Sequence, residues 1–361
     1  FRLEKVIEQP IAHLFAQPGG REEKIMKKTR MKLMALCLSA AMCVPVLGGC
    51  GNRKADTQRV GTERVAAAQD AAEDRWIMDP ADVFVQPVEG ISDDFIRGMD
   101  ASAVLSIEKS GAKYYGYDGK EQDVFKTLAE SGINYIRLRV WNNPYDADGN
   151  GYGGGNNDVA TAVELGKRAT EYGMKVSIDF HYSDFWADPK RQHAPKAWQG
   201  MTADEKADAL YTFTRGSLKE ILDAGVDVGM VQVGNEINNG MSDETDVPSV
   251  MKLLTAGSKA VRESAADYNK DILVALHYTN ITDNEQVDTM AANLKKYNVD
   301  YDVFGLSYYP FWDGTNENMQ NVAKNIMDKY GKQVMIAETS YAYTTEDGDG
   351  FANSFDGVEG A

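Results

Sequence analysis

Two glutamates in this chain each follow a short apolar run that has the composition of a buried strand. Glu236 closes the run VGMVQVGNE, and Glu338 closes the run KQVMIAE. Hydrolysis of a glycosidic bond needs two carboxyl groups, one to protonate the leaving oxygen and one to attack, or activate water, at the anomeric carbon. A strand-end glutamate can also simply cap its strand or pair with a lysine. Here Asn235 directly precedes Glu236 and offers an amide for a sugar hydroxyl, which favours a catalytic pair.

Aromatic and polar residues recur after the other apolar runs. A sugar presents apolar C–H faces and rings of hydroxyl groups, so its groove needs aromatic platforms beside hydrogen-bonding side chains. The candidates are Arg137, Trp141, Asp179, His181, Trp186, His277, Tyr308 and Trp312. Each aromatic taken alone is more often a core residue, but their recurrence at strand ends favours a groove. The two histidines lack the HxH or HExxH spacing of a zinc site.

The elements that must position these residues alternate along the chain. Apolar runs at 95–99, 135–140, 175–180, 229–233, 272–276, 303–306 and 334–337 read as strands. Amphipathic segments at 121–131, 158–172, 203–224, 247–268, 284–297 and 317–330 read as helices. Continuous apolar strands separated by helices indicate a parallel sheet buried on both faces. The sequence therefore predicts the α/β class and a (β/α)8 TIM barrel, whose strand ends all meet at one mouth.

Composition narrows the class of partner. The chain has 361 residues, 43% of them hydrophobic, which suits one barrel of roughly 250 residues with additions. Its formal net charge of −17 disfavours nucleic acid and acidic polysaccharide. No glycine-rich phosphate motif follows the first predicted strand, which argues against nucleotide binding. A neutral polysaccharide is the expected partner.

The amino-terminal part has the pattern of an export signal. Residues 1–25 contain no Met, and we interpret them as upstream sequence foreign to the natural protein. Residues 26–49 combine a basic start with the apolar run 33–47, which predicts a secretory signal peptide. The segment ends in Leu47-Gly-Gly-Cys50, which resembles a bacterial lipobox and implies lipidation of Cys50. An ordinary signal peptide, or a membrane span with a chance cysteine, is the alternative.

The segments after Cys50 complete the predicted organisation. Residues 50–79 are polar and read as a tether, and 80–361 read as the catalytic domain. The three cysteines are Cys37, Cys43 and Cys50, so the mature chain has no pair for a disulfide. We expect an exported protein, lipid-anchored at the bacterial cell surface or the outer face of a membrane.

Six motifs in order resemble one enzyme family. They are NYIRLRVWNNP (134–144), SIDFHYSDFWADP (177–189), VQVGNEIN (231–238), ALHY (275–278), GLSYYPFW (305–312) and IAETSY (336–341). They closely resemble glycoside hydrolase family 53, the arabinogalactan endo-β-1,4-galactanases. The resemblance spans about residues 91–355. It implies a retaining (β/α)8 enzyme that cleaves neutral β-1,4-galactan, a pectin side chain, and needs no cofactor for its chemistry.

The resemblance also implies residue roles. Glu236 would be the acid/base and Glu338 the nucleophile, with Arg137 supporting the nucleophile and Asn235 contacting the sugar 2-hydroxyl. The remaining substrate-binding residues would be Asp179, His181, His277 and Tyr308, with Trp141, Trp186 and Trp312 as sugar platforms.

The chain departs from the family pattern at its end. The family continues through an eighth strand and a last helix, whereas 23 residues follow Glu338 here. We therefore expect an open barrel, and a 361-residue chain that is poorly soluble and nearly inactive. A complete chain would be a monomer.

A loop after the nucleophile suggests calcium. Asp347, Asp349 and Asn353 place oxygen ligands at spaced positions on a glycine-rich loop, as hard cations require. Bacterial family members resemble this loop but have a His where Phe351 stands. An ordinary acidic turn is the alternative to one structural calcium ion.

Two further functions stay open at this point. One is a related retaining endo-glycanase, such as a mannanase or cellulase, which shares the two glutamates but not the segment HYSDFWADP. The other is a surface lipoprotein that binds glycans without turnover.

Overall fold

The computed structural model describes residues 77–78, 84–85 and 88–340. Cys50, the calcium candidates Asp347, Asp349 and Asn353, and the predicted segments 1–25 and 26–49 lie outside these residues, as does nearly all of the tether. Within the described part of the chain, no helix has the length and apolarity needed to cross a membrane.

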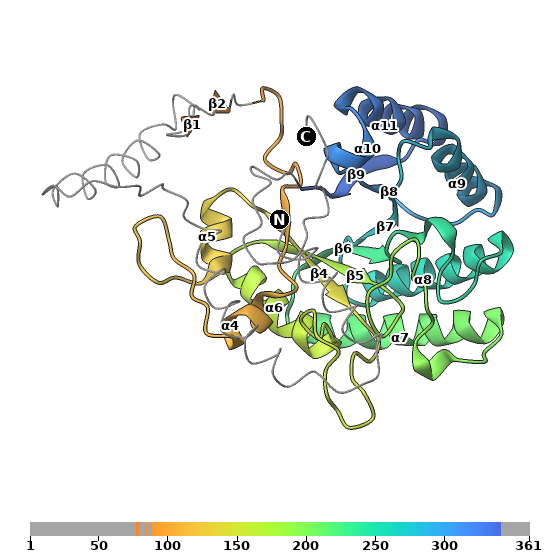
Figure 1. The fold of residues 1–361 in the computed structure, drawn as a ribbon, viewed down its shortest axis with the longest axis horizontal. Coiled ribbons are helices and arrows are strands. Elements are labelled where there is room, and N and C mark those ends of the chain that lie inside the picture. Colours follow the sequence, from red (N-terminus) through yellow and green to blue (C-terminus); the bar gives the residue numbers. More distant parts are fainter. Residues whose placement is uncertain (1–76, 79–83, 86–87, 341–361) are drawn as a thin grey trace, which may run out of the picture.

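One parallel sheet of seven strands forms the centre of the fold, with the strands in chain order (Figure 1). Its strands are β3 (Gly98–Asp100), β4 (Tyr135–Val140), β5 (Lys175–Phe180), β6 (Val228–Val233), β7 (Leu273–Tyr278), β8 (Val303–Ser307) and β9 (Gln333–Glu338). A separate antiparallel pair joins β1 (Ile77–Met78) to β2 (Phe84–Val85). The seven-stranded sheet curls into an incomplete barrel with β3 and β9 at its two ends.

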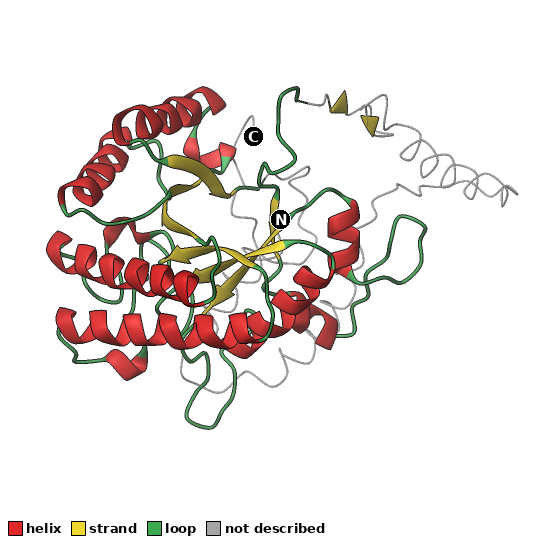
Figure 2. Cartoon of the chain, turned by 180° about the vertical axis from the view of Figure 1, so that it is seen from behind, coloured by secondary structure: helices red, strands yellow, loops and turns green. Residues whose placement is uncertain are grey.

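Helices follow the strands and cover the outer face of the sheet (Figure 2). They are α4 (Val104–Lys109), α5 (Val124–Glu130), α6 (Val159–Glu171), α7 (Ala203–Asp223), α8 (Val247–Asp267), α9 (Asn284–Lys296), α10 (Pro310–Asp313) and α11 (Asn316–Tyr330), with 3-10 turns η1 (Lys196–Trp198) and η2 (Ile237–Asn239). The prediction of a (β/α)8 barrel that lacks its eighth unit is confirmed for the residues that the structure describes.

Side-chain caps fix where the long helices begin. Thr202 and Glu205 form a reciprocal capping box at the start of α7. Asp246 accepts a hydrogen bond from the Ser249 backbone amide at the start of α8, where Pro248 fits the first turn. These local signals explain why the predicted helix boundaries lie within a few residues of the observed ones.

The first predicted strand was placed too early. Residues 95–99 were expected to be extended, but β3 covers Gly98–Asp100 and pairs through Asp100 with Arg137 of β4. Phe95 lies in a turn and is 55% exposed. The strand therefore begins later than predicted, and only the end of the apolar run belongs to it. The last residue of β3 is the polar Asp100, which lies at the end of the sheet where the candidate site forms.

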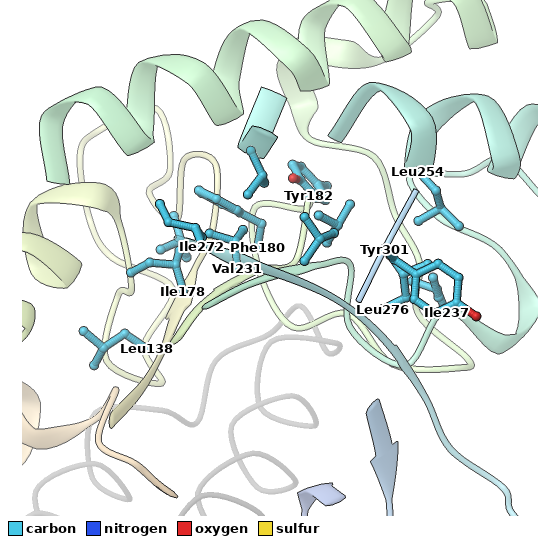
Figure 3. Packing of buried hydrophobic residues seen from close by; sticks show 14 of the residues in the cluster. Leu138, Ile178, Phe180, Tyr182, Val231, Ile237, Leu254, Ile272, Leu276 and Tyr301 are labelled. Atoms are coloured by element: carbon cyan, nitrogen blue, oxygen red, sulfur yellow. The ribbon is translucent and has the colours of Figure 1, made fainter. Parts of the chain in front are cut away.

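Two apolar layers fill the fold on opposite sides of the strands, because successive side chains of a strand point to opposite faces. The larger layer lies between sheet and helices and includes Leu138, Ile178, Val231 and Leu276 (Figure 3). The smaller layer lies inside the curled sheet, where Met230, Ala275 and Val303 pack with Tyr135, Leu273 and Met335. Further along the same inner positions the residues become polar, and these form the candidate site.

Candidate active site

Arg137 is the centre of the polar inner layer. Its guanidinium lies 3.2 Å from Asp100, 2.8 Å from Asp179 and 3.0 Å from Glu338, which come from three other strands. It also donates to the Gln232 side chain at 3.2 Å and to Asn235 Oδ1 at 2.9 Å. A guanidinium has five donors in a fixed fork, so one residue can align several acceptors at once. Arg137 thereby fixes Glu338 relative to the neighbouring strands.

Glu338 ends β9 and receives two donors on its two oxygens. Arg137 contacts Oε1 at 3.0 Å, and the Tyr309 hydroxyl donates to Oε2 at 2.8 Å. Burial, with the nearby Glu338 and Glu236 carboxylates, raises the pKa of Tyr309 well above its usual range, so the hydroxyl remains a donor. Both contacts stabilise an ionised carboxylate with a defined orientation, as a nucleophile requires.

Glu236 lies three residues beyond the end of β6, on a backbone that the loop holds in an unusual conformation. Gly234 has φ +86° and Glu236 has φ 46°, so the chain turns sharply into η2. The Gln192 side chain donates to the backbone carbonyls of Asn235 at 2.8 Å and Glu236 at 3.2 Å. A non-glycine residue in the left-handed region is strained and persists where its surroundings hold it. The Glu236 carboxylate itself contacts the Ser307 hydroxyl at 2.7 Å.

Asp179 and His181 are buried beside Arg137 and Gln232, and hydrogen bonds link these four side chains. Asp179 is fully buried and accepts from Gln232 at 2.7 Å as well as from Arg137. His181 is buried, and its Nδ1 accepts from the Ala187 amide at 3.0 Å, so its Nε2 donates to Asp179 at 3.0 Å. Protein groups thus occupy both ring nitrogens. A direct contact of His181 or Asp179 with substrate stays a prediction, and the hydrogen bonds described above give both residues a positioning role.

His277 is likewise enclosed by protein. It is fully buried, with Nδ1 2.8 Å from Asn235 Oδ1 and Nε2 2.9 Å from Ser307 Oγ. Burial lowers the pKa of His277 from 6.5 to about 4. Because the unfolded histidine binds a proton at higher pH than the folded one, the fold loses stability as pH falls from 6.5 toward 4. A direct contact between His277 and a sugar stays a prediction.

The three predicted tryptophan platforms differ in exposure. Trp141 is fully buried against Phe185, at a ring separation of 4.9 Å, and its role as a sugar platform stays a prediction. Trp186 is half-buried, with the Arg139 guanidinium 3.9 Å from its ring centroid on one face. Trp312 is 40% exposed and packs beside Tyr309 at 5.6 Å. Trp312 is therefore the platform candidate that lies nearest to the Glu338 hydrogen-bond network.

Tyr308 points away from the site. Its hydroxyl lies 2.8 Å from Asn316 Oδ1 and 3.0 Å from the Gly314 carbonyl, to either of which it can donate, and its ring belongs to the outer apolar layer. A contact between Tyr308 and substrate stays a prediction. Since side chains alternate along an extended chain, Ser307 and Tyr309 face inward instead.

Sequence reasoning missed five residues that build the site: Asp100, Gln192, Gln232, Ser307 and Tyr309. The alternation of inward and outward positions could have identified Gln232, Ser307 and Tyr309. No group of three metal-ligating side chains occurs among the residues that the structure describes.

Replacement of Tyr309 with Phe should lower kcat by about 10- to 100-fold, because a hydrogen bond to a charged carboxylate is lost. KM should change little if the hydroxyl acts on the nucleophile alone. Steady-state kinetics on a soluble aryl glycoside measures both. Tyr308→Phe is the matched control, since it removes a neighbouring hydroxyl that faces the outer layer; an equal loss in the two variants would contradict the role assigned to Tyr309.

Comparisons with known proteins agree with the geometry. A family model described as glycosyl hydrolase family 53 matches residues 96–359. The chain is 54% identical over 273 residues to the endo-β-1,4-galactanase of Bacillus subtilis (strain 168), a match that covers 76% of this chain and 63% of that protein. The chain therefore spans less than two thirds of the length of this curated relative.

Two solved structures resemble the fold. The family 53 catalytic domain from Ignisphaera aggregans superposes with a TM-score of 0.70 at 39% identity, over 76% of each chain. A structure described as one of two fungal β-1,4-galactanases gives a TM-score of 0.61 at 28% identity, over 68% of this chain and 74% of the other.

Proposed function

Because the chain belongs to glycosyl hydrolase family 53, we propose that it hydrolyses internal β-1,4-galactosidic bonds of galactan and arabinogalactan, the side chains of pectin, with retention of configuration. The Bacillus subtilis relative is an endo-β-1,4-galactanase, and other relatives of similar coverage are described as arabinogalactan endo-β-1,4-galactanases.

The observation that carries the proposal is the different environment of the two glutamates. Glu338 is held by the cationic Arg137 and the Tyr309 hydroxyl, which favour an ionised nucleophile. Glu236 contacts the neutral Ser307 hydroxyl at 2.7 Å, an uncharged partner where Glu338 has a cationic one. Acid and nucleophile roles require two carboxyl groups whose surroundings differ, so that one can hold a proton while the other stays ionised.

The reaction proceeds in two steps. Glu236 gives its proton to the glycosidic oxygen while a Glu338 oxygen attacks the anomeric carbon, so the leaving sugar departs and a galactosyl ester forms on Glu338. Glu236, now ionised, takes a proton from water as that water attacks the same carbon and releases Glu338. Each step inverts the configuration, and the product keeps the β-anomer.

Substrate class is tested with a panel of polysaccharides. Potato-type β-1,4-galactan should release galacto-oligosaccharides, whereas β-mannan and cellulose should stay intact. Chromatography of the products distinguishes the three functions that the sequence left open. Release from mannan or cellulose would replace the galactanase assignment, and binding of galactan without any release would indicate a glycan-binding protein.

The surface anchor rests on sequence alone. Cys50 follows an apolar segment and precedes a polar stretch, and a tethered enzyme suits polymers too large to import. Cys50→Ala expressed in a bacterial host should move the protein from the membrane fraction to the medium. Cys43→Ala, within the removed signal segment, is the matched control and should stay at the membrane. Mass spectrometry of wild-type protein without a lipid on Cys50 would contradict the anchor.

A structural calcium ion at Asp347, Asp349 and Asn353, and a monomeric state, complete the proposal. The spaced oxygen ligands of this glycine-rich loop support the ion, although Phe351 stands where bacterial family members have a His. A calorimetric titration with calcium that gives no binding heat would contradict the calcium site. A dimer mass in light scattering would contradict the monomeric state.

A further inference from the structure

The Ser307 hydroxyl lies between two groups that compete for its single proton. Its Oγ is 2.7 Å from Glu236 Oε1 and 2.9 Å from His277 Nε2. A hydroxyl donates one hydrogen bond and can accept others. Whichever partner receives the Ser307 proton, the other must itself donate to Oγ or leave the contact unsatisfied.

The neighbours of His277 decide which ring nitrogen carries a proton. Asn235 donates through Nδ2 to the Ala187 carbonyl at 2.9 Å, which fixes the amide and turns Oδ1 toward His277 Nδ1 at 2.8 Å. An amide oxygen only accepts, so Nδ1 must be the donor. Gln232 Nε2 is also 3.2 Å from Nδ1, but its two hydrogens have closer acceptors in Asp179 at 2.7 Å and in the Gly234 carbonyl and Asn235 Oδ1, each at 3.1 Å. His277 is therefore the Nδ1–H tautomer, and Nε2 is an acceptor.

The ring stays neutral in this position. Burial, together with the Arg137 cation on β4, outweighs the carboxylates of Glu338 on β9 and Asp179 on β5 and lowers the pKa of His277 to about 4. The neighbouring His181 acts in the same direction as burial, and Glu236 reaches the ring through Ser307. A neutral ring with Nδ1 protonated has its Nε2 lone pair directed at Ser307.

We propose that His277 is a positioning residue that acts through Ser307 to favour the protonated form of Glu236. Nε2 accepts the Ser307 proton, so Ser307 Oγ faces Glu236 as an acceptor and the carboxylic acid donates to it. The inference rests on the proposed acid/base role of Glu236 and adds a reason why this carboxyl group, rather than Glu338, holds the proton.

The same chain of contacts serves the second step. Once Glu236 has lost its proton to the leaving oxygen, Ser307 can turn its hydroxyl to the carboxylate, the direction in which the 2.7 Å contact suits an ionised Glu236. His277 Nε2 is then a buried acceptor without a donor, which costs free energy. This cost favours the state in which Glu236 is protonated again and Ser307 donates to Nε2. Ser307 thus gives Glu236 a hydrogen-bond partner in both its protonated and its ionised state. His277 shifts the protonation equilibrium of Glu236 toward the protonated form.

A double-mutant cycle tests the coupling. His277→Phe removes the acceptor, so the basic limb of the pH profile of kcat/KM should move to lower pH by about one unit. His277→Gln places an amide oxygen near the Nε2 position and should restore most of the shift. In a Ser307→Ala background, the His277→Phe change should no longer move the limb, because the connecting hydroxyl is gone.

The control variant is Tyr278→Phe. Tyr278 is the next residue on β7 and is fully buried in the outer layer, stacked on Phe304 at 4.8 Å. Its pH profile should match the wild type. Equal limb shifts for His277→Phe with and without Ser307 would overturn the proposal, as would a loss of kcat with no limb shift in either background.

A measurement without substrate separates this inference from the galactanase assignment. Nitrogen-15 NMR reports which ring nitrogen is protonated, and the chain has four histidines, so the signal lost in His277→Gln identifies His277. We expect a neutral Nδ1–H ring between pH 5 and 8, and an Nε2–H tautomer would overturn the proposal. A protein that shows the Nδ1–H tautomer but cleaves no galactan would refute the function alone.

Discussion

In a chain that carries the complete barrel, replacement of Glu338 with Ala is expected to lower turnover of galactan by at least about 10⁴-fold, because the carboxylate that forms the covalent intermediate is gone. Arg137 and Tyr309 would then hold a water or an anion where the carboxylate stood, at the positions now 3.0 and 2.8 Å from its oxygens. Binding of galactan should persist, since the other polar residues stay in place. The loss should therefore appear in kcat, as steady-state kinetics would measure.

Azide makes this experiment specific. With an aryl β-galactoside, azide can enter the space left by the Glu338 side chain and attack the anomeric carbon from the same face. The variant should then regain turnover and yield the α-galactosyl azide. Glu220→Ala removes an exposed glutamate of α7 and is the matched control. A β-azide product, or activity close to the wild type in Glu338→Ala, would contradict the nucleophile role.

Replacement of Glu236 with Ala should have the second largest effect, a loss of about 10²- to 10⁴-fold on galactan, whose leaving group needs a proton. A dinitrophenyl galactoside has a leaving group that departs unprotonated, so its first step should be nearly normal. Hydrolysis of the ester on Glu338 then becomes slow, and an initial burst of dinitrophenol should appear. Azide should speed the second step and give the β-galactosyl azide.

Glu236→Gln serves as the closer variant, because it keeps the volume and the Ser307 contact while it removes the acid. It should resemble Glu236→Ala on galactan. Equal losses on galactan and on the dinitrophenyl substrate would show that Glu236 is not the acid, since an acid's contribution depends on the leaving group.

The strand ends could be predicted from sequence because the pattern is local. Apolar runs of strand length, each followed by an amphipathic segment, predicted the parallel strands, and the catalytic pair followed from their positions. The first strand was misplaced because Phe95 and Ile96 precede β3, whose three residues include the polar Asp100. A strand so short has too little pattern to locate.

The inner face of the site was harder to predict, since it depends on register and on contacts distant in sequence. Tyr308 and Tyr309 are adjacent and chemically alike, yet only Tyr309 points to Glu338. Had Ser307 been assigned to the inner face of β8, the alternation of side chains would have placed Tyr309 on that face and Tyr308 on the outer one. Gln192 offered no comparable signal, because it reaches Glu236 through a loop that only the folded chain brings close. Burial of Trp141 likewise follows from neighbours in the β5–α7 loop.

The central claim is that Glu338 attacks and Glu236 protonates, in a reaction that retains configuration. Proton NMR during the first minutes of galactan hydrolysis resolves the anomeric proton of the new reducing end before mutarotation. The β-anomer should appear first and the α-anomer only later, as the product equilibrates. Appearance of the α-anomer first would show that water attacks directly, and would contradict the covalent role of Glu338.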